Sequence, residues 1–206
     1  MMEEKWLAWA KQIQSIAQAG LTYTRDDYDY ERYIELRQLS ADILETYTEY
    51  DMKTIQELFT NETGYQTPKV DIRAAVFKEG KILLVKEKAD GKWSIPGGWG
   101  DVGFSPGEVA VKEVEEESGY LVEAKRLLAV LDHKHHPHPP SPYHIYKMII
   151  GCELVGGNAA DSIETSDCDF FSLDNLPPLS IGRITESQIT MLFKLYENPT
   201  LPTVFD

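Results

Sequence analysis

A glycine-rich loop that runs directly into an acidic helix is the sequence feature that most constrains this chain. The loop begins at Gly97 and Gly98, and the helix is predicted over residues 106–118. Ser105 is the predicted N-cap, because Glu108 three residues later can complete a capping box. Gly119 follows the helix and can adopt the left-handed conformation that ends it. A loop and a helix joined in this way are predicted to form one structural unit.

Three carboxylates of this helix fall on one face. At about 100° per residue, Glu113, Glu116 and Glu117 lie within roughly 100° of one another, whereas Glu115 points about 150° away from their middle. Like charges at this spacing weaken a helix. A bound hard cation such as Mg²⁺ or Mn²⁺ would reverse that effect, because such ions take oxygen ligands together with substrate phosphates. The alternative is an acidic helix face that only contacts water.

The loop and helix resemble the signature of the Nudix hydrolases. That signature has a glycine, a glutamate six residues later, and then a helix containing Arg-Glu, a Glu-Glu pair and a final glycine. Six positions match in register: Gly98, Glu113, Val114, Glu116, Glu117 and Gly119. Three positions depart from it, since Phe104, Lys112 and Tyr120 replace the first glutamate, the arginine and the last aliphatic residue. The resemblance extends over about residues 70–196.

The resemblance implies an activity and a metal site. Nudix hydrolases cleave a nucleoside diphosphate linked to another group and need a divalent metal, here Mg²⁺ or Mn²⁺. The metal ligands implied for this chain are Glu113, Glu116, Glu117 and a backbone carbonyl near Gly98. In that family the first glutamate and the arginine help to join the loop to the helix, and both are altered here. The fold implied is an α/β/α sandwich with a mixed sheet.

The first part of the chain is predicted to be helical. Helices are expected over residues 3–19, 27–47 and 52–59, the first ending at Gly20. The apolar stripe of the first helix consists of Trp6, Trp9, Ala10, Ile13, Ile16 and Ala17. Residues 61–68 contain Gly64 and Pro68 and indicate a linker. The sequence thus divides into a helical module, residues 1–62, and a Nudix domain, residues 68–206.

The helical module carries more aromatic area than a short helical hairpin can bury. The residues concerned are Trp6, Trp9, Tyr30, Tyr33, Ile43, Leu44 and Phe59. We therefore expect it to form a homodimer interface as well as a pocket wall, with packing onto its own catalytic domain as the alternative. A helical module before a Nudix domain resembles the CDP-choline pyrophosphatase group, which implies cleavage of CDP-choline to CMP and phosphocholine.

The second part of the chain changes to strand patterns. Strands are predicted over residues 70–76, 82–85, 124–131, 144–154 and 169–173, with a last helix over 185–196. Strands around a central helix, closed by a second helix, favour a mixed sheet between helical layers. This pattern agrees with the α/β fold that the resemblance implies.

Hydrolysis of a diphosphate needs charge neutralisation, an activated water and a positioned substrate. Metal ions can supply the first two. Glu116 and Glu117 could instead share the role of base with a later acid, because a carboxylate beside cations stays ionised near neutral pH. The resemblance implies a further acid from the loop before the last strand, where Asp161, Glu164 and Asp167 are candidates and Glu164 is favoured. Cations that could hold phosphate oxygens are Arg73, Lys86 and Lys88, although each could instead be an ordinary surface residue.

All five histidines lie between His133 and His144, among four prolines. The prolines predict a stiff loop without helix or strand. A metal site of several histidines, a substrate lip and an exposed crossover are the three interpretations. For the substrate lip, His136 and Tyr143 are the candidate binding residues.

Composition limits the partners and the compartment. A net charge of −14 disfavours long nucleic acids as ligands, because their affinity depends on basic residues. No apolar run approaches the roughly 18 residues of a membrane helix, and residues 1–11 do not resemble a signal peptide. The two cysteines, Cys152 and Cys168, have no metal-ligand spacing. A cytoplasmic enzyme acting on a small molecule is expected.

Other functions use the same acids. The enzyme could instead be an ADP-ribose or nucleoside diphosphate-sugar pyrophosphatase, a nucleoside triphosphate pyrophosphatase or an RNA-trimming enzyme. A nucleotide sensor that binds metal without cleaving its ligand is the alternative from another class, and the intact Glu113, Glu116 and Glu117 argue against it. The sequence does not identify the group attached to the diphosphate.

Overall fold

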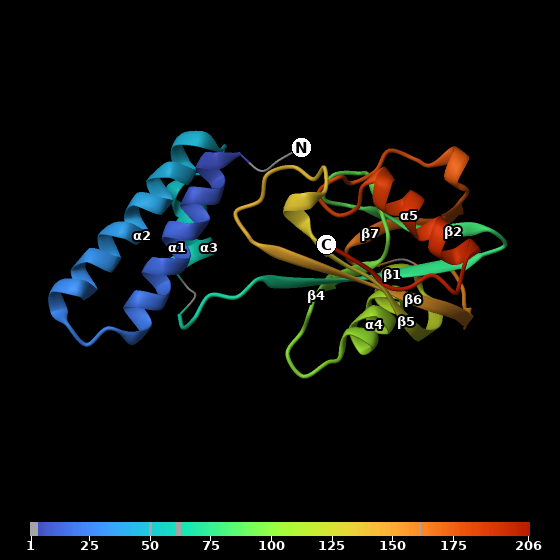
Figure 1. Cartoon of the computed structure of the whole chain (residues 1–206). Helices are drawn as coiled ribbons and strands as arrows, with labels where there is room; N and C mark the ends of the chain where they lie inside the picture. The colour runs from blue at the N-terminus through green and yellow to red at the C-terminus, as the bar shows by residue number, and fades with distance from the viewer. Residues whose placement is uncertain (1–3, 50, 61–62, 161) are drawn as a thin grey trace. The chain divides into compact units, whose positions relative to one another are not determined.

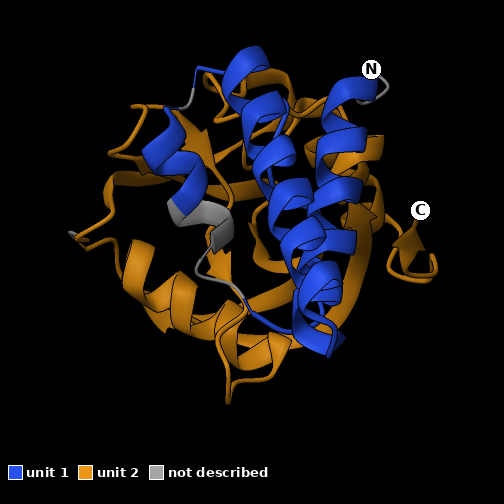
Figure 2. Cartoon of the chain, turned by 90° about the vertical axis from the view of Figure 1, so that its left-hand side faces the viewer, with its two compact units in different colours: residues 1–68, 140–144 blue, residues 69–139, 145–206 orange. Residues whose placement is uncertain are grey.

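The computed structural model describes residues 4–49, 51–60, 63–160 and 162–206, without the side chains of residues 57–60. The chain divides into two compact units. Unit 1 comprises residues 1–68 and 140–144, and unit 2 comprises residues 69–139 and 145–206 (Figure 2).

Unit 1 contains three helices, α1 (Lys5–Tyr23), α2 (Asp27–Tyr47) and α3 (Met52–Thr60). The Asp26 side chain caps α2 by accepting a hydrogen bond from the Asp29 backbone N–H at 3.0 Å. The helices α1 and α2 lie side by side (Figure 1). Their shared core consists of Leu7, Ala10, Ala41, Leu44 and Ile55. The predicted helices before the Nudix-like domain are thus present, and the Phe59 side chain lies outside the described residues.

Two details of α1 were predicted wrongly. Gly20 does not end the helix, which continues to Tyr23. A Cβ on Gly20 would lie 2.4 Å from ring atoms of Tyr33, so glycine permits the close approach of α2 rather than a stop. The buried face of α1 also differs from the predicted stripe: Trp9 and Ile16 are exposed, whereas Gln14 and Gln18 are buried.

Unit 2 is built on a mixed sheet in which the order β3-β2-β1-β6-β5-β8 forms the main path, with β4 paired to β1 and β7 to β2. The strands are β1 (Lys69–Lys78), β2 (Lys81–Glu87), β3 (Trp93–Ser94), β4 (Gly97–Trp99), β5 (Tyr120–Asp132), β6 (Ile145–Gly157), β7 (Thr165–Phe171) and β8 (Val204–Phe205). The two central strands β1 and β6 run parallel, whereas β1 with β2 and β5 with β6 run antiparallel.

One helix packs on each face of this sheet (Figure 1). The first, α4 (Pro106–Ser118), buries Val109, Ala110 and Val114 against one face. The second, α5 (Glu186–Glu197), buries Ile189 and Leu192 against the other. Alternation along β1 explains the two cores, because successive side chains point to opposite faces of a sheet. The predicted α/β/α sandwich is confirmed.

The predicted strand limits were too short, and some elements were missed. Residues 133–135 form a short 3₁₀ helix within the stretch predicted to have no regular structure. The last long strand covers Thr165–Phe171, and Leu173 already belongs to a second 3₁₀ turn, Leu173–Asn175. The short strands β3, β4 and β8 were not predicted. Within the described residues, no helix combines the length and apolar composition that a membrane span requires.

Candidate active site

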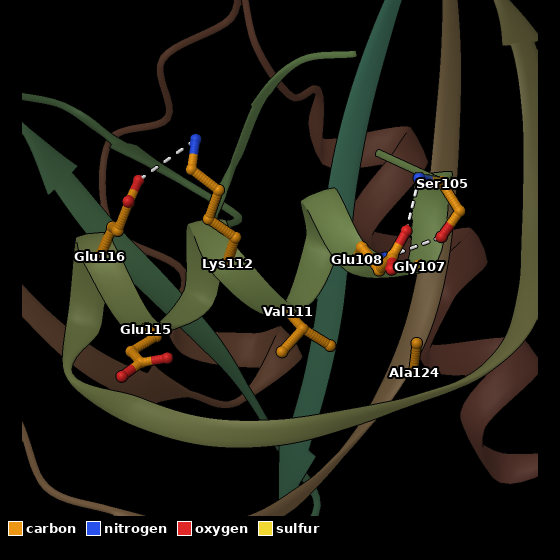
Figure 3. Close-up of a pocket in the computed structure, with 8 residues that line it drawn as sticks. All are labelled: Ser105, Gly107, Glu108, Val111, Lys112, Glu115, Glu116 and Ala124. Carbon is orange, nitrogen blue, oxygen red and sulfur yellow. Dashed lines mark hydrogen bonds and ion pairs between the residues drawn. The ribbon is translucent and has the colours of Figure 1, made fainter. Parts of the chain in front are cut away.

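The acidic helix α4 is fixed at both ends as its sequence predicts. The Ser105 side chain accepts from the Glu108 backbone N–H, and the Glu108 carboxylate accepts from the Ser105 N–H at 2.7 Å (Figure 3). Gly119 ends the helix with a φ of 75°. A Cβ on Gly119 would lie 2.5 Å from the Asn158 carbonyl oxygen, so only glycine fits this close turn.

The three predicted metal ligands lie at different depths along α4. Glu117 is 4% exposed, and its Oε2 accepts a hydrogen bond from the Gly97 backbone N–H at 3.0 Å. Glu113 lies over the loop, because a Cβ on Gly98 would be 3.1 Å from its Oε1. Glu116 is more exposed and faces Lys112, whereas Glu115 points to another side of the helix (Figure 3). The buried carboxylates therefore converge on the glycine loop.

Burial raises the pKa values of two of these carboxylates, and the neighbouring positive charges oppose this rise only partly. Burial raises the pKa of Glu117 to about 8, although the Gly97 N–H and Arg73 oppose that rise. Burial also raises the pKa of Glu113, and the neighbouring Glu116 and Glu164 add to this effect. Among the described residues, no group of three His, Cys, Asp or Glu side chains is already arranged around one point.

The donor chemistry nevertheless fits a hard divalent cation. Mg²⁺ and Mn²⁺ take oxygen ligands. The site offers such oxygens in its carboxylates and in a backbone carbonyl next to Gly98. Burial disfavours the charged form of Glu113 and Glu117, and a bound cation would favour it. Glu113 and Glu116 also lie 3.7 and 3.6 Å from Lys112 Nζ, so this ammonium would be the neighbour of a bound ion.

Lys112 joins the glycine loop to the helix. Its Nζ donates to Asp101 Oδ2 at 3.1 Å, and this hydrogen bond raises the pKa of Lys112. Phe104, which replaces the first glutamate of the signature, is 52% exposed. The acid that pairs with Lys112 in this chain is therefore Asp101, and position 104 carries an apolar side chain.

Glu164 lies in a turn that is tied to α4. Burial is the main cause of the raised pKa of Glu113, and the charge of Glu164 adds to it, so Glu164 lies close enough to act on this acid. The next residue, Thr165, donates from its hydroxyl to the Glu117 carbonyl at 2.6 Å. Of the other two candidates, Asp167 is exposed on β7, and Asp161 lies outside the described residues.

The predicted phosphate-binding cations have different surroundings. Lys88 Nζ donates to the carbonyls of Ser162 and Ile163 at 2.6 and 3.0 Å, so it holds the turn before Glu164. Lys86 is half-buried on β2. Arg73 is only 6% exposed, and its Nε donates to Asp71 at 2.8 Å. This burial argues against the predicted contact of Arg73 with substrate phosphate.

The histidine-rich segment is divided between the two units. His138 donates from Nδ1 to the Ile181 carbonyl at 2.7 Å, accepts from Gln188 Nε2 at 3.1 Å, and stacks on His133. Burial lowers the pKa of His138 to about 4, so this ring is neutral. The predicted substrate residue His136 contacts Asp206 at 3.1 Å, whereas Tyr143 belongs to the segment 140–144 of unit 1.

Several residues of the site region were missed by sequence reasoning. Lys147 lies on β6 with 1% exposure, and its Nζ donates to Asp71. A lysine inside the apolar run of residues 145–150 was a detectable signal, because lysine is almost never buried without a partner. The ties made by Thr165 and Asp101 leave no comparable signal, since their partners lie far away in the sequence.

Comparison with known proteins places this chain in a family. The Nudix domain family matches residues 67–193, and a family described as the UDP-X-like N-terminal oligomerisation domain matches residues 4–59. Together with the sandwich fold and the acidic helix, the first match covers more than half of the chain. The chain belongs to the Nudix family and is a pyrophosphohydrolase.

Individual relatives extend over the whole chain. YjhB of Bacillus subtilis strain 168, whose name proposes an ADP-ribose pyrophosphatase, is 51% identical over 205 residues, covering 100% of this chain and 99% of YjhB. The crystal structure of an ADP-ribose pyrophosphatase from Streptococcus suis is 46% identical, with a TM-score of 0.63 over 68% of this chain and all of that one. A UDP-X diphosphatase structure is 34% identical, with a TM-score of 0.65 and complete coverage of both chains.

Proposed function

We propose that this enzyme hydrolyses the diphosphate linkage of ADP-ribose to AMP and ribose 5-phosphate, with Mg²⁺ or Mn²⁺. The observation that carries the proposal is the 51% identity to YjhB over the full length of both chains. The Streptococcus suis relative, which is 46% identical over 68% of this chain, supports the same substrate.

A UDP-linked compound is the second candidate substrate. It is favoured by the N-terminal helices, which match a UDP-X-like domain, and by the full-length similarity to a UDP-X diphosphatase. CDP-choline, expected from the sequence resemblance, stays a prediction that these relatives do not test. All three compounds share a nucleoside diphosphate joined to another group, so the same acids would serve each of them.

The proposed chemistry assigns a role to each group. A divalent cation, when bound, neutralises the diphosphate and lowers the pKa of a coordinated water. Glu113, Glu116, Glu117 and the backbone carbonyl of Gly98 would hold it. Glu164 is the proposed general base, because it lies in a segment that Thr165 and Lys88 fix in place and its charge acts on Glu113. Lys86 is the proposed contact for an outer phosphate oxygen.

The test is a substrate panel of ADP-ribose, UDP-glucose, CDP-choline and nucleoside triphosphates, each with Mg²⁺ or Mn²⁺ and with products identified by mass. We expect ADP-ribose to give the highest kcat/KM. Hydrolysis in ¹⁸O-labelled water shows which phosphorus is attacked. Preferred cleavage of triphosphates would refute the proposal. A higher kcat/KM for UDP-glucose or CDP-choline would make that compound the substrate in place of ADP-ribose.

Two helix variants serve as internal controls of the panel. Glu116→Gln should lower kcat by at least about 100-fold, because it removes a proposed metal ligand. Glu115→Gln should change kcat by less than about twofold, since this exposed side chain points away from the cluster. Equal effects of the two substitutions would contradict the assigned metal face.

A further inference from the structure

A buried set of charges lies beside the glycine loop, outside the proposed metal ligands. Asp71 and Arg73 are each 6% exposed and Lys147 is 1% exposed. Asp71 on β1 pairs in register with Lys147 on β6, so their side chains share one face of the sheet. One Asp71 oxygen accepts from Arg73 Nε at 2.8 Å and the other accepts from Lys147 Nζ.

Such a cluster needs a reason beyond stability. The desolvation of buried ions offsets much of their mutual attraction, and apolar replacements are often equally stable. The sheet face continues into a purely apolar core at Ala75 and Ile149. The charged row is therefore confined to the end of β1 that adjoins the loop.

Arg73 contacts the strand that leads into the loop. Its Nη1 donates to the Ile95 carbonyl at 3.3 Å. A Cβ on Gly97 would lie 2.8 Å from the Arg73 Cα and 2.9 Å from its Cδ, so Gly97 rests directly on this side chain. Gly97 in turn donates its N–H to Glu117 at 3.0 Å. An unbroken series of contacts thus leads from Asp71 through Arg73 and Gly97 to Glu117.

The charge of Arg73 also acts on the buried acids around it. It lowers the pKa of Glu117 against the effect of burial, and Asp71, Glu117 and Glu87 together raise the pKa of Arg73. Glu87 has a second cationic partner, because Arg183 Nε lies 3.0 Å from its Oε1. Arg73 thus acts on Glu117 through its charge as well as through its contact with Gly97.

We propose that Arg73 is a positioning residue that holds the Ile95–Gly98 segment and the Glu117 carboxylate in the arrangement required for the divalent cation. Asp71 and Lys147 orient its guanidinium. The inference rests on the proposed metal role of Glu117. The predicted contact of Arg73 with substrate phosphate is the alternative role.

The decisive variant is Arg73→Lys, which keeps the charge. Arg73 bonds Asp71 through Nε and the Ile95 carbonyl through Nη1. A lysine has a single nitrogen at the end of its chain, so it does not reproduce the fixed geometry of these two bonds. We expect the nucleotide-free protein to bind Mn²⁺ about 10-fold more weakly, measured by calorimetry and by electron paramagnetic resonance of free Mn²⁺. At saturating Mn²⁺, kcat should fall while KM for the nucleotide changes by less than about threefold.

Two further variants separate positioning from general destabilisation. Arg183→Lys is the control, because it makes the same substitution at an arginine that pairs with Glu87. It should leave the Mn²⁺ affinity within about twofold of the parent. Lys147→Met removes the second partner of Asp71 and should weaken Mn²⁺ binding in the same direction as Arg73→Lys, since Asp71 then lacks one of its restraints. Thermal unfolding of each variant checks that the fold is retained.

The possible results are distinct. A higher KM with unchanged Mn²⁺ affinity in Arg73→Lys would overturn the inference and restore the phosphate-binding role. Unchanged Mn²⁺ binding and unchanged kinetics, or equal losses in Arg73→Lys and Arg183→Lys, would also overturn it. If Glu117→Gln itself left Mn²⁺ affinity unchanged, the proposed metal site would fail independently of Arg73.

Discussion

At the scale of single residues, Glu117 is a buried carboxyl group that accepts a hydrogen bond from the Gly97 backbone N–H. Its pKa is raised to about 8, so the folded protein favours the protonated form. In metal-free buffer this acid therefore stabilises the fold least at high pH. The stability present below the unfolded-state pKa, near 4.5, is lost as the pH rises through about 8.

The first prediction follows from that sign. At pH 8.5 without metal, Glu117→Gln should have a higher free energy of unfolding than the parent, by roughly 1–3 kcal/mol, and therefore a higher thermal midpoint. The difference should shrink toward pH 5. Calorimetry at both pH values measures it. Adding Mn²⁺ should stabilise the parent and have little effect on the variant. A glutamine variant that is equally destabilised at both pH values would show that the carboxylate is a favourable part of the metal-free fold.

Local residue chemistry was predictable from the sequence wherever the partners are close in the chain. Ser105, Glu108 and Gly119 take their predicted capping roles because each partner lies within a few residues. The pairing of Asp71 with Lys147 joins positions 76 residues apart and depends on strand register. The sequence pattern shows that Lys147 is buried but not which acid it meets.

At the scale of elements, the glycine loop depends on Lys112 for its attachment to α4. The Lys112–Asp101 pair is half-exposed, with side-chain exposures of 36% and 50%. The pair joins the loop to the helix although the first glutamate of the signature is absent at position 104. The shift to Asp101 could not be predicted, because the loop conformation decides which side chain reaches Lys112.

The second prediction tests this attachment with a double-mutant cycle. Asp101→Asn and Lys112→Met should each lower kcat, and the double variant should lose less than the sum of the two free-energy changes. The coupling in unfolding free energy should be about 0.2–1 kcal/mol, as expected for an exposed ion pair. Asp90→Asn, which alters an acid bonded instead to Ser180, is the control in the same background. Strict additivity would mean that the observed contact has no energetic role.

The third prediction concerns the packing of α1 on α2. Gly20→Ala would gain about 1 kcal/mol of helix propensity in an unrestrained helix. Here the new Cβ would meet the Tyr33 ring at 2.4 Å, so we expect the substitution to lower the thermal midpoint. In a Tyr33→Ala background the same change should raise it, because the obstructing ring is gone. Thermal unfolding of the four proteins gives the answer, and an effect of the same sign in both backgrounds would refute the packing explanation.

At the scale of the whole molecule, unit 1 has a small core and an exposed apolar row. Trp9, Ile16 and Tyr23 recur every seven residues along α1 and are 59%, 52% and 67% exposed. Residues at this spacing lie on one helix face, which is typical of helix–helix association. The sequence identified the helix but assigned Trp9 and Ile16 to the wrong face, because Gln14 and Gln18 take the buried positions.

The last prediction is that this row forms the interface of a homodimer. The match of residues 4–59 to an oligomerisation domain supports it, and aromatic residues are enriched at interface cores. Light scattering should give a dimer for the full chain and a monomer for Trp9→Glu/Ile16→Glu, since buried unpaired carboxylates oppose association. Gln12→Glu adds a charge to an exposed position of the same helix and should remain dimeric. Circular dichroism checks that the helices persist in each variant. A monomeric parent, or a double variant that stays dimeric, would exclude this face as the interface and favour packing of the helices within one chain.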